Sequence, residues 1–245
     1  MKMSHYVPNV KYTHQPTVRC VSHTGGDASV LAAMLVSTQG AKSLKALTED
    51  PEAGEGRIRF LMKNKHGSPF EHNQFRFYVK APIFVFREFH RHRIGWSYNE
   101  ESGRYKKLAP SFYVPAYDRP LIQTGKPGAY IMEPADQQTQ YYTHQLMYEA
   151  YEAAAEKYEQ LLGLGIAKEV ARAVLPVGLN SSMYATCNAR SLMAFLSLRT
   201  DEPSATFPSK PQYEIEQVAR KMEAVFAKKM PITYKCWNDN GRVAP

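Results

Sequence analysis

The sequence predicts an α+β fold in a single domain over residues 1–245. Three observations lead to this class. One segment alternates apolar and polar residues with a period of two, several others repeat apolar residues at helical spacing, and no repeat, low-complexity tract or linker divides the chain. Hydrophobic residues make up 44% and charged residues 22%, which is an ordinary globular composition, and the chain is long enough to bury a sizeable core.

The N-terminal quarter of the chain is expected to be extended first and helical afterwards. The first 25 residues contain prolines and lack helical periodicity. Asp27 is expected to cap a helix over 27–35, because a short acidic side chain satisfies free amides of the first turn. A turn-rich segment then precedes a second helix over 57–65.

The next elements are predicted to be a strand and a helix. In residues 73–80 (NQFRFYVK), two phenylalanines and a valine alternate with polar side chains, which is typical of a half-buried strand. Pro82 suits the first turn of a helix, so a helix is expected over 82–93. The segment 91–107 (RHRIGWSYNEESGRYKK) is charged, aromatic and glycine-containing, and it predicts neither a core helix nor a strand.

Helices dominate the predicted C-terminal half. Residues 108–135 are rich in proline and tyrosine, lack periodicity and are expected to form a long connection, and the segment 178–187 is mixed. The loop 200–211 contains three prolines. Helical periodicity predicts helices over 136–162, 167–176, 188–199 and, as the last element, 211–229. Tyrosines along the longest of these helices indicate packing, with a subunit interface as the alternative.

The charge balance indicates an anionic partner. The formal net charge is +8 and the isoelectric point is near 9.3. This favours nucleic acid, a nucleotide or an anionic cofactor, although a merely soluble basic protein is an equal alternative. No apolar run is long enough to span a membrane, the N-terminus does not resemble a secretory signal, and three widely spaced cysteines predict a cytoplasmic protein.

Several chemistries are disfavoured by the motifs. Four histidines lie within residues 66–92, but without HExxH spacing or cysteine ligands, so no metal site is expected. Cys187 lies in an apolar context that is more typical of packing than of a nucleophile. The chain also lacks the glycine-rich motifs of Rossmann and P-loop proteins.

Arginines at predicted helix ends are the strongest candidates for a binding site. A guanidinium binds phosphate or carboxylate with two parallel hydrogen bonds. Arg190 and Arg199 bracket the apolar run SLMAFLSL, and Ser102-Gly103-Arg104 combines a hydroxyl, backbone amides and a guanidinium, which predicts a phosphate site. Further arginines of this kind are Arg87, Arg91, Arg93 and Arg172.

These residues carry a resemblance to a known family. Arg91-His92-Arg93, a spacer and then Ser102-Gly103-Arg104-Tyr105 are similar to the signature of the flavin-dependent thymidylate synthases (the ThyX family). Residues 66–72, 80–93, 169–176 and 188–199 also resemble family blocks and occur in the family's order. The spacer is one residue longer than is commonest, with the extra residue at Gly95-Trp96, where a glycine can absorb a bulge.

The resemblance implies an activity and an assembly. Family members reductively methylate dUMP to dTMP, with methylenetetrahydrofolate as carbon donor and NADPH-reduced FAD as hydride source. They are homotetramers of a single domain with a central antiparallel β-sheet packed by helices, and residues from more than one subunit form each active site. The expected partners are therefore dUMP and further copies of the chain, without nucleic acid, membrane or metal.

The resemblance also implies roles for individual residues. Arg199 corresponds to a catalytic arginine that polarises the uracil and favours ionisation of its ring nitrogen. Flavin contacts correspond to Ser37, His66, Ser68, Arg91, His92, Arg93, Asn99, Glu100, Asn188 and Arg190. Contacts to the nucleotide correspond to Glu88, Arg91, Glu100, Ser102, Gly103, Arg104, Arg172 and Arg199.

Two other classes of function are weighed against this one. A basic nucleic-acid-binding protein that uses arginine and tyrosine stacking would explain the charge and the aromatic residues, but not the ordered blocks. A structural protein built on the tyrosine-rich helix explains still less. A yellow preparation that bleaches with NADPH distinguishes the flavoenzyme from both.

Overall fold

The computed structural model describes residues 9–245, which separate into two compact units. The described part of the first unit comprises residues 9–16, 80–89 and 100–182, and the second comprises 17–79, 90–99 and 183–245. The α+β class is confirmed, since helices and strands both occur but do not alternate regularly. The single domain over 1–245 stays a prediction.

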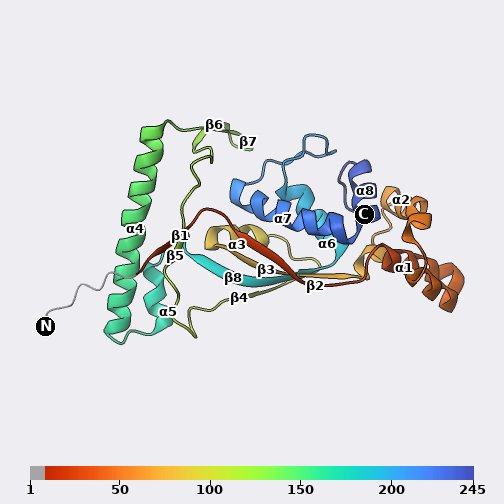
Figure 1. The fold of residues 1–245 in the computed structure, drawn as a ribbon, viewed down its shortest axis with the longest axis horizontal. Helices are drawn as coiled ribbons and strands as arrows, with labels where there is room; N and C mark the ends of the chain where they lie inside the picture. Colours follow the sequence, from red (N-terminus) through yellow and green to blue (C-terminus); the bar gives the residue numbers. More distant parts are fainter. Residues whose placement is uncertain (1–8) are drawn as a thin grey trace. The chain divides into compact units, whose positions relative to one another are not determined.

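A four-stranded sheet in the order β2-β3-β8-β4 is the largest sheet in the described residues (Figure 1). Its strands are β2 (Thr17–Thr24), β3 (Gln74–Pro82), β8 (Asn180–Cys187) and β4 (Trp96–Glu100). Just beyond the end of β3, the Ile83 amide donates to the Leu179 carbonyl, which precedes β8 (2.9 Å). Where β4 ends, the Glu101 amide likewise donates to the Ser182 carbonyl near the start of β8 (2.8 Å). A strand end beside a strand start is the antiparallel arrangement, so the expected antiparallel sheet is confirmed.

In the second unit, helices α6 and α7 cover one face of this sheet (Figure 1). The alternation predicted for β3 is confirmed, because Phe75 and Phe77 are fully buried while Arg76 is exposed. The Phe75 ring meets Phe226 of α7 edge-on at 6.0 Å. The helices of this unit are α1 (Asp27–Gln39), α2 (Glu55–Lys63), α6 (Ala189–Arg199), α7 (Tyr213–Lys229) and α8 (Pro231–Asp239), with short 3-10 helices at η1 (Gly40–Leu47), η2 (Pro51–Gly54) and η3 (Ser68–Glu71).

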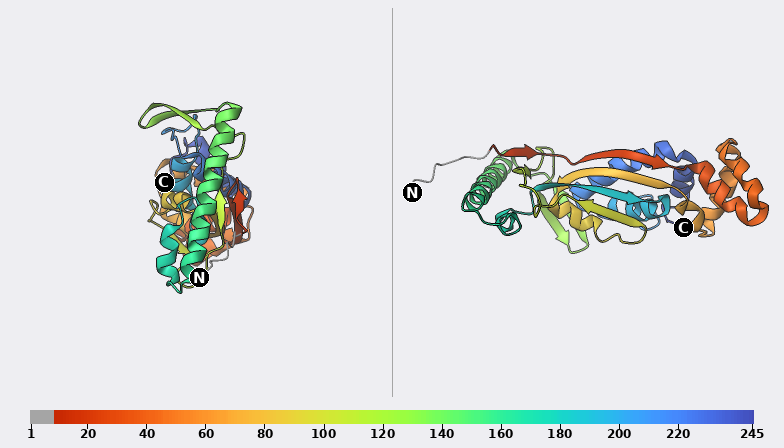
Figure 2. Two further views of the ribbon diagram at one scale, coloured as in Figure 1. Left: turned by 90° about the vertical axis from the view of Figure 1, so that its left-hand side faces the viewer. Right: turned by 90° about the horizontal axis from the view of Figure 1, so that it is seen from below.

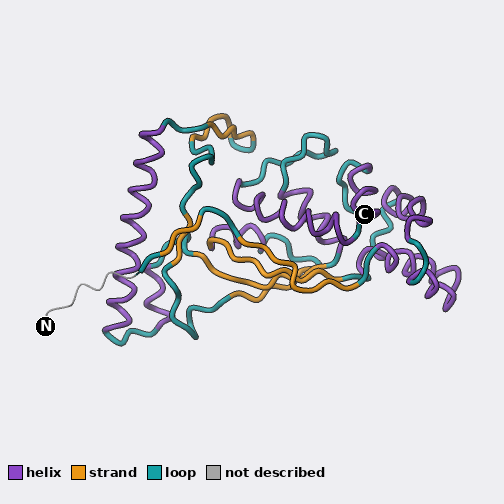
Figure 3. The backbone as a smooth tube through the Cα atoms, in the orientation of Figure 1, coloured by secondary structure: helices purple, strands orange, loops and turns teal. Residues whose placement is uncertain are grey.

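The first unit is built around the long helix α4 (Figures 2 and 3). Asp136 caps it by accepting a hydrogen bond from the Thr139 amide, which confirms the predicted start. Phe112 stacks on Tyr151 of α4 with centroids 4.6 Å apart, within a core that includes Val114, Ala155 and Leu179. The elements are α3 (Ile83–Phe89), α4 (Gln137–Gly163), α5 (Lys168–Ala171), η4 (Arg172–Val174), the parallel pair β1 (Lys11–Thr13) and β5 (Ser111–Tyr113), and the hairpin β6 (Ile122–Lys126) and β7 (Ala129–Glu133).

The expected helix over 82–93 is wrong in its extent. Pro82 closes β3, and α3 ends at Phe89, so the Arg91-His92-Arg93 motif lies in a turn. The turn then passes through Gly95, whose φ of +70° is in the left-handed region and is incompatible with a continuing helix.

Strands account for most other differences from the sequence-based expectations, and all of them except the eight-residue β8 are short. The segment 91–107 contains β4, the connection 108–135 contains β5, β6 and β7, and the mixed segment 178–187 is largely strand β8. Three- to five-residue strands show little periodicity, and partner strands rather than local sequence stabilise them. The helix over 211–229 is confirmed as α7, but it is not the last one, because α8 follows it. No helix among residues 9–245 is long and apolar enough to cross a membrane.

Asp27 has a different role from the one expected. Gly26 is the N-cap residue of α1, and Asp27 is the first residue of the helix. The Asp27 carboxylate is buried and accepts hydrogen bonds from the Ile232 amide (3.0 Å), the Thr233 amide (2.9 Å) and the Thr233 hydroxyl (2.6 Å). It therefore caps the distant helix α8 and supplies acceptors for amides that have no partner within that helix.

Asp27→Ala is expected to lower the free energy of unfolding by about 2–3 kcal/mol, because it leaves the buried Ile232 and Thr233 amides without an acceptor. Urea unfolding followed by circular dichroism measures the change. The matched control is Asp50→Ala, which removes an exposed cap of the Glu52 amide and should cost only about 0.5–1 kcal/mol. Equal losses in the two variants would contradict the assigned role.

Candidate active site

Helix α6 carries an arginine near each end and is capped by side chains on both sides. The Asn188 carboxamide oxygen accepts from the Ser191 amide (2.9 Å), and Asn73 accepts from the Ala189 amide (2.7 Å). At the other end, the Thr200 amide donates to the Leu196 carbonyl (3.1 Å). The 11 residues of α6 span about 16 Å, so a rigid and well-capped element separates Arg190 from Arg199.

A group of polar side chains gathers where the first turn of α6 meets the segment 66–71, here called the Gly67 cluster: His66, Ser68, Glu71 and Arg190. Gly67 is buried, and a Cβ at this position would lie 2.4 Å from Arg190 Cζ. Only glycine therefore lets the guanidinium pack on this backbone. Arg190 Nη1 donates to Glu71 Oε1 at 2.7 Å, and both side chains remain more than 40% exposed. His66 and Ser68 are also exposed, so the cluster presents donors to a ligand.

His92 and Arg199 form the second group, at the C-terminal end of α6. Arg199 Nε donates to His92 Nε2 at 3.2 Å. The His92 ring meets Phe195 at 4.9 Å, and its carbonyl accepts from the Tyr98 hydroxyl at 2.9 Å. Burial, together with the nearby Arg199 cation, lowers the pKa of His92 to about 4. His92 is therefore neutral at pH 7 and acts as the acceptor that orients Arg199.

Gly95 forms a tight turn between the Arg91-His92-Arg93 motif and strand β4. Its left-handed backbone is combined with a close approach to α6, because a Cβ here would lie 2.1 Å from Ser191 Oγ. The next residue, Trp96, is buried, stacks on Tyr98 (5.6 Å) and meets the Phe195 ring at a tilt (5.3 Å). The chain therefore makes a turn at Gly95 that packs on α6. Arg91 and Arg93 lie exposed on either side of His92 in the same turn region.

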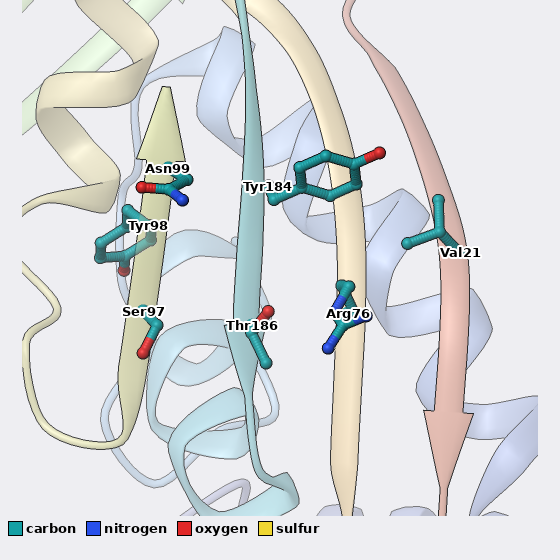
Figure 4. A pocket seen from close by; sticks show the side chains of 7 residues that line it. All are labelled: Val21, Arg76, Ser97, Tyr98, Asn99, Tyr184 and Thr186. Atoms are coloured by element: carbon teal, nitrogen blue, oxygen red, sulfur yellow. The ribbon is translucent and has the colours of Figure 1, made fainter. Parts of the chain in front are cut away.

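The open face of the sheet in the second unit contains a hollow of about 570 Å³ (Figure 4). Tyr184 pairs edge-on with Tyr78 at 5.9 Å. The lining is thus aromatic and cationic with a few hydrogen-bonding groups, which suits a planar polar ligand. Of the predicted site residues, only Asn99 contributes to it. The lining residues are Val21, Arg76, Ser97, Tyr98, Asn99, Tyr184 and Thr186.

In the first unit, the predicted phosphate motif does form a cluster. The Arg104 amide donates to Ser102 Oγ (3.3 Å), and Arg104 Nε donates to Glu169 Oε2 (3.0 Å). Gly103 is buried against Arg172, whose Cδ would lie 3.0 Å from a Cβ at the glycine. Two guanidinium groups, a hydroxyl and a glycine backbone are therefore brought together, as the sequence predicts for an anion site.

Three predicted residues lie outside these clusters. Ser37 is exposed near the end of α1, where its hydroxyl donates to the Met34 carbonyl (3.0 Å). Glu88 is half-buried on α3, and Glu100 is exposed at the end of β4. Two functional neighbours were not recognised from sequence, namely Asn73 and Tyr98. Asn73 precedes a predicted strand as an ordinary loop residue would, and Tyr98 lies in a strand that was not expected.

Neither a thiol nucleophile nor a metal centre is indicated by the cysteines and acidic or histidine side chains within residues 9–245. Cys187 is buried, and burial raises its pKa well above the ordinary thiol value. Burial likewise raises the pKa of Cys20 and of Cys236. In the described part of the chain, no three histidine, cysteine, aspartate or glutamate side chains are arranged to hold a metal ion.

Comparisons with known proteins identify the family. The sequence profile of the family described as "Thymidylate synthase complementing protein" matches residues 19–232. A flavin-dependent thymidylate synthase from Streptomyces avermitilis is 58% identical over 94% of this chain and 93% of its own length. One from Streptomyces coelicolor is 53% identical over 97% of both chains. The chain belongs to the flavin-dependent thymidylate synthases.

A solved structure supports the same family. The UMP/dUMP methylase PolB from Streptomyces cacaoi, bound with 5-Br dUMP, is similar with a TM-score of 0.90 and 47% sequence identity. The similarity covers 96% of this chain and 100% of that chain. A flavin-dependent thymidylate synthase fold therefore extends over nearly the whole protein.

The donor set fits a flavin dinucleotide, whose pyrophosphate is anionic. The Gly67 cluster offers an exposed guanidinium, a hydroxyl and an imidazole, and exposed Arg91 and Arg93 add two further cations. The residues expected to contact the flavin belong to the second unit, except Glu100. Most of those expected to contact the nucleotide belong to the first unit, with Arg91 and Arg199 as the exceptions.

His92→Gln is expected to remove part of the acid sensitivity of the fold. Between pH 6.5 and about 4 the unfolded chain binds a proton at this histidine while the folded chain does not. The free energy of unfolding therefore falls as the pH is lowered through this window, by at most about 1.4 kcal/mol per pH unit. Urea unfolding at half-unit pH steps measures the slope. Identical slopes for the variant and the wild-type protein would show that His92 is not buried as a neutral ring.

Proposed function

We propose that the protein methylates dUMP to dTMP as a flavin-dependent thymidylate synthase, with FAD as cofactor and methylenetetrahydrofolate and NADPH as co-substrates. The observation that carries the proposal is the pairing of Arg199 with neutral His92 at the end of α6. It lies in a chain whose relatives are named for this activity over nearly their whole length.

Arg199 is the proposed catalytic residue. Its guanidinium is oriented by His92, whose neutral ring accepts at Nε2 and does not add a second cation beside Arg199. A guanidinium directed at a uracil carbonyl stabilises the charge that develops on the ring oxygen and ring nitrogen. Such a preorganised donor contributes a few kcal/mol to the transition state, about 2.7–4 for a single donor.

The two anion-binding clusters are proposed to hold different ligands. Ser102, Gly103, Arg104 and Arg172 would bind the nucleotide phosphate through a hydroxyl, backbone amides and guanidinium groups. Glu88, Arg91 and Glu100 are proposed as further nucleotide contacts on the family resemblance.

The flavin is proposed to contact the Gly67 cluster and the turn around His92. Ser68 and Arg190 supply a hydroxyl and a cation there, and Arg91, His92 and Arg93 lie in the turn. Bound FAD supplies the hydride needed for methylation after its reduction by NADPH, while the protein binds, orients and shields the ligands. Ser37, His66, Asn99, Glu100 and Asn188 are proposed as additional flavin contacts on the resemblance.

We also propose a cytoplasmic homotetramer. Free cysteines suit a reducing compartment. Exposed Tyr141, Tyr142 and Leu146 on α4 form an apolar stripe of the kind that subunit interfaces cover.

The purified protein is expected to be yellow, to bleach with NADPH, and to convert dUMP to dTMP when methylenetetrahydrofolate is added. Addition of dUMP should perturb the flavin absorbance, and UMP is assayed in parallel because PolB is a UMP/dUMP methylase. Arg199→Ala is the matched control, since it should retain FAD but lose about 100-fold or more in turnover. A colourless protein that takes up no FAD but binds RNA would instead favour the nucleic-acid-binding alternative.

Replacing Cys20, Cys187 and Cys236 together with serine is expected to leave the rate of methyl transfer within about twofold of wild type. Each thiol has a raised pKa and none lies in the clusters described above, so none has the setting of a nucleophile. Steady-state turnover of the folded, FAD-loaded variant is the measurement. A folded variant with FAD bound and no turnover would show that the reaction needs a thiol.

A further inference from the structure

The segment that follows α8 contacts both ends of α6. This segment, Gly241–Pro245, is here called the C-terminal strap. Gly241 and Arg242 have φ values of +64° and +59°, so two successive left-handed residues turn the chain back toward α6. A non-glycine residue is uncommon in this conformation and is held there by strong side-chain contacts.

Arg242 provides those contacts. Its side chain is 3% exposed, and Nη1 donates to Glu223 Oε1 (2.6 Å) and to Asn238 Oδ1 (2.8 Å). Nη2 donates to the hydroxyl of Thr200 (2.9 Å), and the guanidinium lies 4.1 Å above the Trp237 ring. Thr200 directly follows Arg199 and caps α6. One buried guanidinium therefore ties the residue after Arg199 to α7 and α8.

The other end of the strap reaches the N-terminal end of α6. The Pro245 carbonyl accepts a hydrogen bond from Arg190 Nε at 2.7 Å. Because Arg190 Nη1 is bound to Glu71, the guanidinium is held from two sides. At the first residue of the strap, the Gly241 carbonyl accepts from the Thr206 amide (2.9 Å), which anchors the loop after α6.

The reach of the strap is sufficient for this arrangement. Pro245 follows Arg242 by three residue steps, which extend over about 10 Å. The side chain of Arg242 reaches Thr200 at one end of α6, and the side chain of Arg190 reaches Pro245 at the other. These two side chains cover the remainder of the roughly 16 Å length of α6.

We infer that the C-terminal strap positions the two arginines of α6, with Arg242 acting through Thr200 on Arg199 and the Pro245 carbonyl acting directly on Arg190. Arg242 and Pro245 are positioning residues that touch no ligand. The inference rests on the proposed function, in which Arg199 faces the uracil and Arg190 faces the flavin. The Arg242 end of the strap then affects the binding and reaction of the nucleotide, and the Pro245 end affects the binding of the flavin.

Two variants of the full chain separate the two ends. Arg242→Lys keeps a buried positive charge beside Glu223, but an ammonium cannot reproduce the planar fork that joins Glu223 to Thr200. A chain that ends at Val243 lacks the Pro245 carbonyl and retains Arg242. The control is Arg59→Met, which removes an arginine that also bonds two carboxylates, Glu55 and Asp239, in the same unit but away from α6.

Three readouts are measured for each variant: hydrogen exchange of the α6 amides in flavin-free protein, the Kd for FAD, and kcat and KM for dUMP at saturating FAD. In Arg242→Lys we expect faster exchange at the C-terminal end of α6 and a loss in kcat/KM for dUMP of about 10- to 100-fold, with the Kd for FAD within about twofold. In the chain ending at Val243 we expect the Kd for FAD to rise about tenfold, with dUMP kinetics at saturating FAD near wild type.

The outcomes distinguish a positioning role of the C-terminal strap from a general effect on stability, and failure of this inference from failure of the proposed function. If both variants match Arg59→Met in all three readouts, or if each variant loses FAD affinity and dUMP kinetics equally, the inference is overturned. If the wild-type protein binds no FAD and methylates no dUMP, the proposed function fails. Hydrogen exchange still tests the positioning role of the C-terminal strap in that case. Unchanged exchange of the α6 amides in both variants overturns the inference, and faster exchange at the ends of α6 supports it.

Discussion

The capping of α6 by its flanking residues Asn188 and Thr200, and by the distant Asn73, is the constraint on which the rest of the site depends. A helix of this length leaves amides and carbonyls unpaired at each end, and in a buried position each must find a partner. Asn73, Asn188 and Thr200 supply those partners, and α6 packs its apolar side chains against the sheet. Because both ends are held, the arginines near them occupy defined places rather than sampling solvent.

Electrostatics in this protein follow from how each cation is paired. Arg199 donates to a neutral imidazole, which adds no negative charge beside the guanidinium. Arg104 and Arg190 are instead paired with exposed carboxylates, which an anionic ligand can displace at small cost because exposed ion pairs contribute little. Arg242, fully buried with Glu223, belongs to the framework. Composition alone gives only the total positive charge. The hydrogen-bond and ion-pair partners of each arginine are needed to tell a structural arginine from one directed at a ligand.

The sequence predicts the long elements well and the short ones poorly. Helix α4 and strand β3 have strong periodicity and local caps, and both are confirmed. β4, β5 and α8 are short and depend on partners far away in the chain, so local patterns do not reveal them. The same holds for the site. The arginines were visible as residue types, whereas the His92–Arg199 hydrogen bond and the role of Asn73 arise only from tertiary packing.

The contacts of Asp27 also constrain when this part of the fold can form during synthesis. Its carboxylate joins the start of α1 to the start of α8, and these lie 205 residues apart in sequence at Ile232. During synthesis α1 emerges from the ribosome long before its partner exists. A contact between residues so far apart in sequence carries a large loop-closure entropy, so it forms at a greater entropic cost than local contacts do. Until that contact forms, the carboxylate of Asp27 is solvated by water, and only the nearly complete chain can replace that water with the amides of Ile232 and Thr233.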